Sequence, residues 1–166
     1  MAQGELALEN QLIKQLNSVG YESVDVKDEA SLLANLKLQI EKRKNTTLSE
    51  TEFNKIINIL DKGTVFERAK TLRGEQHIER DNGDNFYFYF LDKESWNTNT
   101  FQVTNQITKE GTYKNRYDVT LLINGLPLVQ IELKRRGVEM AEAFHQIKRY
   151  KKNSFASGVG LFQYIQ

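Results

Sequence analysis

The feature of this sequence that most constrains its fold is a pair of strand-like runs between Tyr117 and Lys134. Both runs are rich in Val, Leu and Ile, and they flank Asn124-Gly125, a favoured closure for a β-hairpin. The first run carries Asp118, and the second carries Glu132 two residues before Lys134. Because side chains alternate between the faces of a strand, the loop length decides whether the two carboxylates lie together.

The register of this hairpin can be predicted from its side chains. A loop of only Asn124-Gly125 would pair Asp118 with Ile131 and point it away from Glu132. A three-residue loop, or a bulge in either strand, places Asp118 directly across from Glu132. Apolar residues then share one face: Val119, Leu121, Ile123, Val129, Ile131 and Leu133. Polar residues share the other: Asp118, Thr120, Gln130, Glu132 and Lys134. We therefore predict the longer loop or the bulge.

Such a hairpin suggests a chemistry. Two carboxylates on adjacent strands offer the oxygen ligands that Mg²⁺ prefers. Lys134 at the edge of the pair could orient or help to activate a water molecule and stabilise charge on a phosphate. The pattern is thus compatible with phosphodiester cleavage, and a charged strand face without chemistry is the alternative.

Composition limits the class of protein. A chain of 166 residues with 39% hydrophobic content fits one mixed α/β domain with its own core. There is no Cys, and the only two histidines, His77 and His145, are far apart, which argues against thiolate and zinc sites. No run approaches the roughly 18 apolar residues of a membrane span, and the polar amino terminus does not resemble a signal peptide. A cytoplasmic location is the expectation.

Basic residues are unevenly distributed, although the formal net charge is only +1. One cluster ends the second strand: Lys134, Arg135 and Arg136. Another ends a predicted helix: Lys148, Arg149, Lys151 and Lys152. Beside a carboxylate site these cations could follow a phosphate backbone, whereas the second cluster alone could simply complement a helix dipole.

The remaining elements are predicted from periodicity and punctuation. Helices are expected over 5–18, over 29–44, from a capping box at Ser49 and Glu52 to Gly63, and over 139–152. The last helix is expected to bury Met140, Phe144 and Ile147. Strands over 86–91 and 101–106 are expected to precede the hairpin in one mainly antiparallel sheet.

Several words of this sequence resemble the PD-(D/E)xK nucleases, and in particular the amino-terminal nuclease domain of the restriction (R) subunit of type I restriction-modification enzymes. These words are Val103-Thr104-Asn105-Gln106, Arg116-Tyr117-Asp118-Val119, Asn124-Gly125-Leu126-Pro127-Leu128-Val129, Ile131-Glu132-Leu133-Lys134 and Glu142 to Tyr150. The resemblance is dense over 101–155 and thinner upstream. It implies a restriction-endonuclease-like α/β core with a mixed central sheet flanked by helices. It also implies that residues 1–166 are one endonuclease domain of a longer subunit, whose helicase-like motor domains would follow.

The resemblance further implies roles for individual residues. Asp118 and Glu132 would bind Mg²⁺, with the backbone carbonyl of Leu133 as a further ligand, and Lys134 would be the catalytic lysine. The other residues with implied roles are Gln146 and Tyr150 of a Q-x-x-x-Y signature, the DNA-contacting Arg135, Arg136, Lys148 and Arg149, and Glu9 as an accessory acid. Tyr117 stands where the motif nominally has Pro, which leaves the carboxylate of Asp118 in place. Gln146 and Tyr150 as an ordinary exposed pair, and Glu9 as a surface charge, are the alternatives.

The resemblance also implies partners. Double-stranded DNA would be cut without sequence preference after ATP-driven translocation, in a complex with modification and specificity subunits that use S-adenosylmethionine. The chain contains no G-x-x-x-x-G-K-[ST], so it should not hydrolyse ATP alone. Two other functions stay open: a different PD-(D/E)xK nuclease of a repair or mobile-element system, and a non-catalytic module that docks DNA or a partner.

Overall fold

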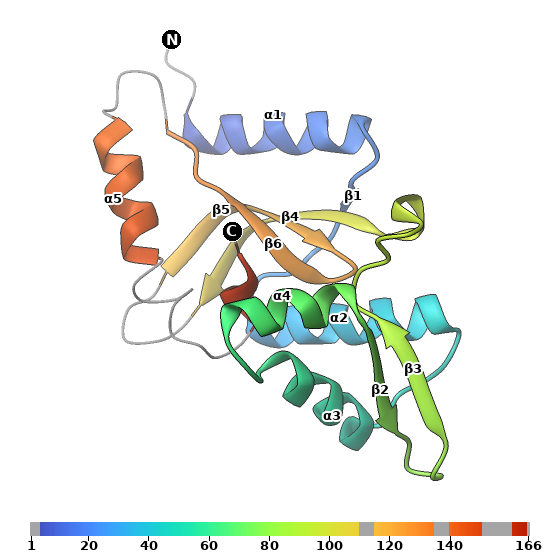
Figure 1. Cartoon of the computed structure of the whole chain (residues 1–166). Coiled ribbons are helices and arrows are strands. Elements are labelled where there is room, and N and C mark those ends of the chain that lie inside the picture. Colours follow the sequence, from blue (N-terminus) through green and yellow to red (C-terminus); the bar gives the residue numbers. More distant parts are fainter. Residues whose placement is uncertain (1–3, 110–114, 135–139, 151–160, 166) are drawn as a thin grey trace.

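The computed structural model of the chain describes residues 4–109, 115–134, 140–150 and 161–165 (Figure 1). The elements in chain order are α1 (Glu5–Ser18), β1 (Glu22–Ser23), α2 (Glu29–Lys44), α3 (Glu50–Leu60), α4 (Val65–Arg73), β2 (Glu75–Glu79), β3 (Asn85–Tyr89), η1 (Trp96–Thr98), β4 (Phe101–Lys109), β5 (Asn115–Ile123), β6 (Leu126–Ile131), α5 (Met140–Tyr150) and η3 (Leu161–Tyr164). None of the helices in these ranges is both long and apolar enough to cross a membrane.

The central sheet is mixed, as predicted. Its strand order is β1-β4-β5-β6, with β1 parallel to β4 and the other two pairs antiparallel. In Figure 1, α1 lies on one side of this sheet and α2, α3 and α4 lie on the other. The predicted α/β core, a mixed sheet flanked by helices, is therefore confirmed.

The aromatic strand does not join the central sheet, and this part of the prediction is wrong. Among the described strands, β3 pairs only with β2, in a separate two-stranded sheet. The strand β2 was not predicted, because its residues Glu75–Glu79 are mostly polar and only Ile78 is fully buried. One face of β3 is buried through Phe86 and Phe88, while Tyr87 and Tyr89 on the other face are exposed.

Three helices begin with a capping box. The N-cap and N3 residues satisfy each other's backbone N–H groups at Asp28 and Ser31, at Ser49 and Glu52, and at Thr64 and Glu67. The predicted helix after Ser49 ends at Leu60, three residues before Gly63, and α4 follows as a helix that periodicity missed. Gly63 has φ +87 and lies in the tight link between these helices.

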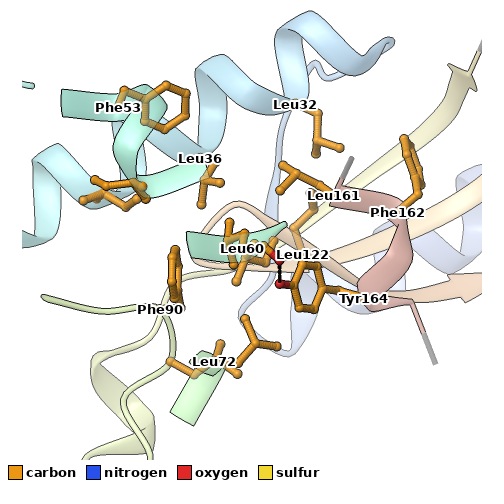
Figure 2. Packing of buried hydrophobic residues seen from close by; sticks show 14 of the residues in the cluster. Leu32, Leu36, Phe53, Leu60, Leu72, Phe90, Leu122, Leu161, Phe162 and Tyr164 are labelled. Atoms are coloured by element: carbon orange, nitrogen blue, oxygen red, sulfur yellow. Dashed lines mark hydrogen bonds between the residues drawn. The ribbon is translucent and has the colours of Figure 1, made fainter. Parts of the chain in front are cut away.

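The main core lies between the sheet and the second helical layer. Figure 2 shows Leu36 of α2, Leu60 of α3, Leu72 of α4 and Leu122 of β5 meeting in it, with Tyr164 of η3 beside them. The hydroxyl group of Tyr164 donates a hydrogen bond to the carbonyl oxygen of Leu60 at 2.5 Å. The segment 161–165 thus closes the core beneath the hairpin.

The hairpin turn is buried against α2. Asn124 and Gly125 both have positive φ, +52 and +84, as a two-residue type I′ turn requires. The side-chain amide of Asn124 donates to the carbonyl oxygen of Phe90, and its oxygen accepts from the backbone N–H of Thr100. These contacts fix the end of the hairpin, from which the register of the two strands is counted.

Candidate active site

The register of β5 and β6 contains the predicted irregularity. Next to the turn, Ile123 pairs with Leu126 and Leu122 with Pro127. The pairing then shifts by one residue, so that Leu121 faces Val129, Thr120 faces Gln130 and Val119 faces Ile131. Leu128 is the extra residue, and the hairpin therefore has a two-residue loop with one bulge. Continuing this register places Asp118 across from Glu132, as predicted.

A hydrogen bond joins the two ends of the hairpin beyond the last ladder pair, and an ion pair lies beside it. The backbone N–H of Leu133 donates to Oδ2 of Asp118 at 2.8 Å. Lys134 Nζ donates to Oε1 of Glu132, also at 2.8 Å. The side chain of Glu132 is only 1% exposed and that of Lys134 is 21% exposed. Asp118, Glu132 and Lys134 therefore gather at one end of the β5–β6 pair.

Burial and charge act on the site in opposite directions. Burial raises the pKa of Glu132, and the nearby charge of Asp118 raises it further, while the hydrogen bond from Lys134 opposes both. Burial alone would lower the pKa of Lys134, but the hydrogen bond and charge of Glu132, with the charges of Asp118 and Glu5, outweigh it and raise the pKa. Lys134 is therefore an ammonium ion at neutral pH, suited to orienting or stabilising an anion rather than accepting a proton.

One atom of the site suits a cation. Oε2 of Glu132 is buried, and in the described part of the chain it accepts no hydrogen bond. A buried carboxylate oxygen without a donor is costly, and a divalent cation shared with Asp118 would relieve both that cost and the repulsion between the two acids. Within the described ranges no group of three or more His, Cys, Asp and Glu side chains is close enough to hold a metal. A cation here would thus need water or a carbonyl oxygen, such as that of Leu133, to complete its ligands.

Glu9 is the buried residue of α1, with 4% exposure. Its Oε2 accepts hydrogen bonds from the amides of Asn105, at 3.3 Å, and Gln106, at 3.2 Å. It is therefore not a surface charge, although it does not form a three-acid group with Asp118 and Glu132. Its role as an accessory acid stays a prediction.

The helix α5 carries the remaining predicted residues. Gln146 is half-buried, and Lys148 is exposed with its Nζ 4.6 Å from the centre of the Phe144 ring. Phe144 and Ile147 are 55% and 46% exposed, so the prediction that they pack inward is wrong. The apolar spacing of this helix is real, but no described element covers that face. Arg135 and Arg136, and the side chains of Met140, Arg149 and Tyr150, lie outside what the structure describes.

The structure adds two residues, Asn105 and Gln106, to which the sequence patterns assigned no individual role. Asn105 and Gln106 bind Glu9, and Gln106 has a left-handed backbone, φ +56, inside β4. One feature of the sequence could have indicated them, because both residues belong to a segment that carries the family resemblance, Val103-Thr104-Asn105-Gln106.

Comparison with known families gives one result for the whole chain. Residues 2–166 match the family model described as the type I restriction enzyme R protein N terminus.

Three curated proteins similar to this chain are named as endonuclease subunits of type I restriction enzymes. The Staphylococcus aureus (strain COL) type I restriction enzyme SauCOLORF180P endonuclease subunit is 47% identical over 169 residues, covering 99% of this chain and 18% of that protein. The Staphylococcus saprophyticus SsaAORF53P endonuclease subunit is 44% identical, with the same coverage. The Escherichia coli EcoprrI endonuclease subunit is 41% identical over 170 residues, covering 99% of this chain and 54% of that protein. The chain thus spans about a fifth of the length of its staphylococcal relatives.

Proposed function

Because this chain belongs to the family of type I restriction enzyme R protein N termini, we propose that it is the Mg²⁺-dependent nuclease domain of such an endonuclease subunit. Within a complete enzyme it would cut double-stranded DNA without sequence preference, after translocation driven by ATP elsewhere in the complex. The observation that carries the proposal is the bulged register, which sets Asp118 opposite Glu132 with Lys134 beside them. A regular two-residue hairpin would have turned Asp118 away.

Each residue has a task in this proposal. Asp118 and Glu132 would hold the metal ion, with the carbonyl group of Leu133 as a further ligand. A bound Mg²⁺ would polarise the scissile phosphate and lower the pKa of a water molecule. Lys134 would orient that water and stabilise the negative charge that develops on the phosphate, which its raised pKa favours.

The remaining predicted residues belong to substrate binding. Lys148 is exposed on α5 and would contact backbone phosphates, together with Arg135, Arg136 and Arg149. Gln146 and Tyr150 would support the site or contact DNA from the same helix. Contacts to phosphate carry no sequence information, which suits cleavage without sequence preference.

Partners of the complete protein are part of the same proposal. The relatives are named as endonuclease subunits of type I restriction enzymes, and this chain matches only a fraction of the staphylococcal ones. We therefore expect motor domains in a longer subunit, and assembly with modification and specificity subunits that supply S-adenosylmethionine chemistry and target recognition. A repair or mobile-element nuclease is the alternative that a gene without downstream helicase motifs would favour.

The test is DNA cleavage by the full-length subunit assembled with its partner subunits, ATP and Mg²⁺. The variants Asp118→Asn, Glu132→Gln and Lys134→Ala should each lower cleavage roughly a hundredfold or more while ATP hydrolysis persists. The matched control is the surface ion pair of Lys37 and Glu50, at 2.6 Å, whose replacement by Ala and Gln should leave cleavage unchanged. If all three site variants cut at the wild-type rate, the hairpin is structural and the proposal is wrong.

A further inference from the structure

Gln106 has a backbone conformation that a strand residue rarely adopts. Its φ of +56 lies in the left-handed region, which favours Gly and is costly for other residues. On either side of it, Asn105 pairs with Val119 and Ile107 pairs with Tyr117. Gln106 therefore stands opposite Asp118 on the neighbouring strand. Backbone strain of this kind is kept where the surrounding structure requires it.

The left-handed residue changes which way β4 faces. The side chain of Asn105 reaches α1 on one side of the sheet, whereas Ile107 is fully buried in the main core with α2, α3 and α4. On a regular strand these two residues would share a face. The conformation of Gln106 thus lets adjacent amides, Asn105 and Gln106, bind the same oxygen of Glu9.

A lysine fixes the orientation of one amide. Lys27 Nζ donates to the backbone oxygen of Asn105 at 2.9 Å and to its Oδ1 at 2.8 Å. Because Oδ1 accepts from Lys27, the amide nitrogen of Asn105 is the group left for Glu9. Oε2 of Glu9 receives both amides, and among the described residues no hydrogen bond is made to Oε1.

Two acidic residues of α1 interact with residues in or near the site. Glu5 and Glu9 are four residues apart and so lie on one face of the helix. Glu5 is near enough to Lys134 for its charge to act on the ammonium group. Glu9 is bound to the residue that faces Asp118. One face of α1 therefore carries Glu5, whose charge acts on Lys134, and Glu9, which is hydrogen-bonded to Gln106 opposite Asp118.

We infer that Asn105 and Gln106 are positioning residues that hold the carboxylate of Glu9 beside Asp118, with Oε1 left to accept a hydrogen bond from water at the site. The inference rests on the proposed function, since it gives Glu9 a task only next to a metal-binding Asp118. Groups that orient the surroundings of a metal ion commonly change its affinity tenfold or more when they are lost.

Exchanging the carboxylate of Glu9 with the amide of Gln106 distinguishes a positioning role of this pair from a purely structural one. Gln106→Glu sets two carboxylates against each other, and Glu9→Gln removes the acid. The double variant restores an amide–carboxylate pair but moves the carboxylate from α1 to β4. Gln106→Gly removes the amide and suits the positive φ.

The measurements are Mn²⁺ affinity of the full-length subunit without nucleotide, melting temperature, and the Mg²⁺ concentration needed for cleavage by the assembled complex. Asp118→Asn defines the share of Mn²⁺ binding that belongs to this site. We expect roughly tenfold weaker Mn²⁺ binding in Gln106→Glu, Gln106→Gly and the double variant. Added Mg²⁺ should restore cleavage to the two Gln106 single variants. The control is Gln76→Glu, which breaks amide hydrogen bonds to Thr71 and Gly74 in another part of the fold and should leave Mn²⁺ affinity unchanged.

The outcomes are distinct. Wild-type Mn²⁺ affinity in Gln106→Gly, or its recovery in the double variant, overturns the inference, because the pair would then be only a structural link between α1 and β4. If Asp118→Asn itself leaves Mn²⁺ binding and cleavage intact, the proposed function fails first.

Discussion

At the scale of single residues, Glu52 is a buried charge with several hydrogen-bond donors. Its buried carboxylate accepts from Arg80 Nε at 2.9 Å and Nη2 at 3.2 Å, and from the backbone N–H groups of Ser49 and Asp81. The hydrogen bond from Arg80 lowers the pKa of Glu52 to about 2, with burial opposing and the backbone donors assisting. This one side chain ties the start of α3 to the turn after β2.

Stability should depend on the ionisation of Glu52. The pKa is about 2 in the folded chain and near 4.5 when unfolded, so the ionised group contributes its full stabilisation above pH 4.5 and loses it as the pH falls toward 2. Glu52→Gln should cost about 2 kcal/mol of unfolding free energy at neutral pH, and the difference from wild type should shrink in acid. Urea unfolding across this range measures it. The control is Glu50→Gln, because Glu50 is exposed and its replacement should change the unfolding free energy little at any pH. A difference between wild type and Glu52→Gln that does not vary with pH would contradict the assignment.

At the scale of the elements, the hairpin of β5 and β6 depends on a turn with no room for a side chain. A Cβ atom on Gly125 would lie 2.7 Å from Cα and 3.0 Å from N of Leu36, both backbone atoms of α2. Close approach and positive φ together therefore require glycine here. Because the bulge that brings Asp118 opposite Glu132 begins three residues from this turn, the contact with α2 also anchors the site.

Replacing this glycine should be far more costly than replacing another with the same conformation. Gly125→Ala should lower the unfolding free energy by about 3 kcal/mol, since strained backbone is combined with a clash that side-chain motion cannot relieve. Gly83 has φ +87 but open space around it, so Gly83→Ala should cost about 1 kcal/mol. Chemical denaturation of the two variants compares them. Equal costs would mean that the helix moves aside easily.

At the scale of the whole molecule, the last described segment supports the site from the core. The ring of Phe162 in η3 packs against Tyr117 with centroids 5.0 Å apart, and both rings are fully buried. Tyr117 precedes Asp118, so a residue more than forty positions later in the chain packs against the residue beside a predicted ligand. Burial raises the pKa of Tyr164 in the same segment to about 12, which keeps its hydroxyl group neutral and donating to Leu60.

Removing the ring of Phe162 should therefore affect both stability and the site. Phe162→Ala should cost about 3 to 5 kcal/mol, the usual range for a buried phenylalanine. Phe66→Ala is the matched control, because Phe66 is 78% exposed and should cost little. Thermal unfolding measures the cost, and Mn²⁺ affinity of the folded Phe162 variant tests the coupling to Asp118. A cost below about 1 kcal/mol would show that the segment is not part of the core.

The sequence by itself determined the local features of this protein. The capping box at Ser49 and Glu52 placed the start of α3, and the alternation in the hairpin required an odd loop or a bulge before the structure distinguished them. Such features depend on neighbouring residues, whose geometry is nearly fixed by the backbone. Glu9 and the family resemblance were also accessible from the sequence, and the family match agrees with that resemblance.

Only the tertiary structure decided which elements meet. It paired β3 with β2 instead of the central sheet, left Phe144 and Ile147 exposed, and buried Glu9 against Asn105 and Gln106. No local pattern indicates a left-handed residue at Gln106, and the partner of its side chain, Glu9, lies in a helix about a hundred residues earlier in the chain. Contacts between such distant residues depend on the packing of the whole fold, since only the completed core holds the strands and α1 in place.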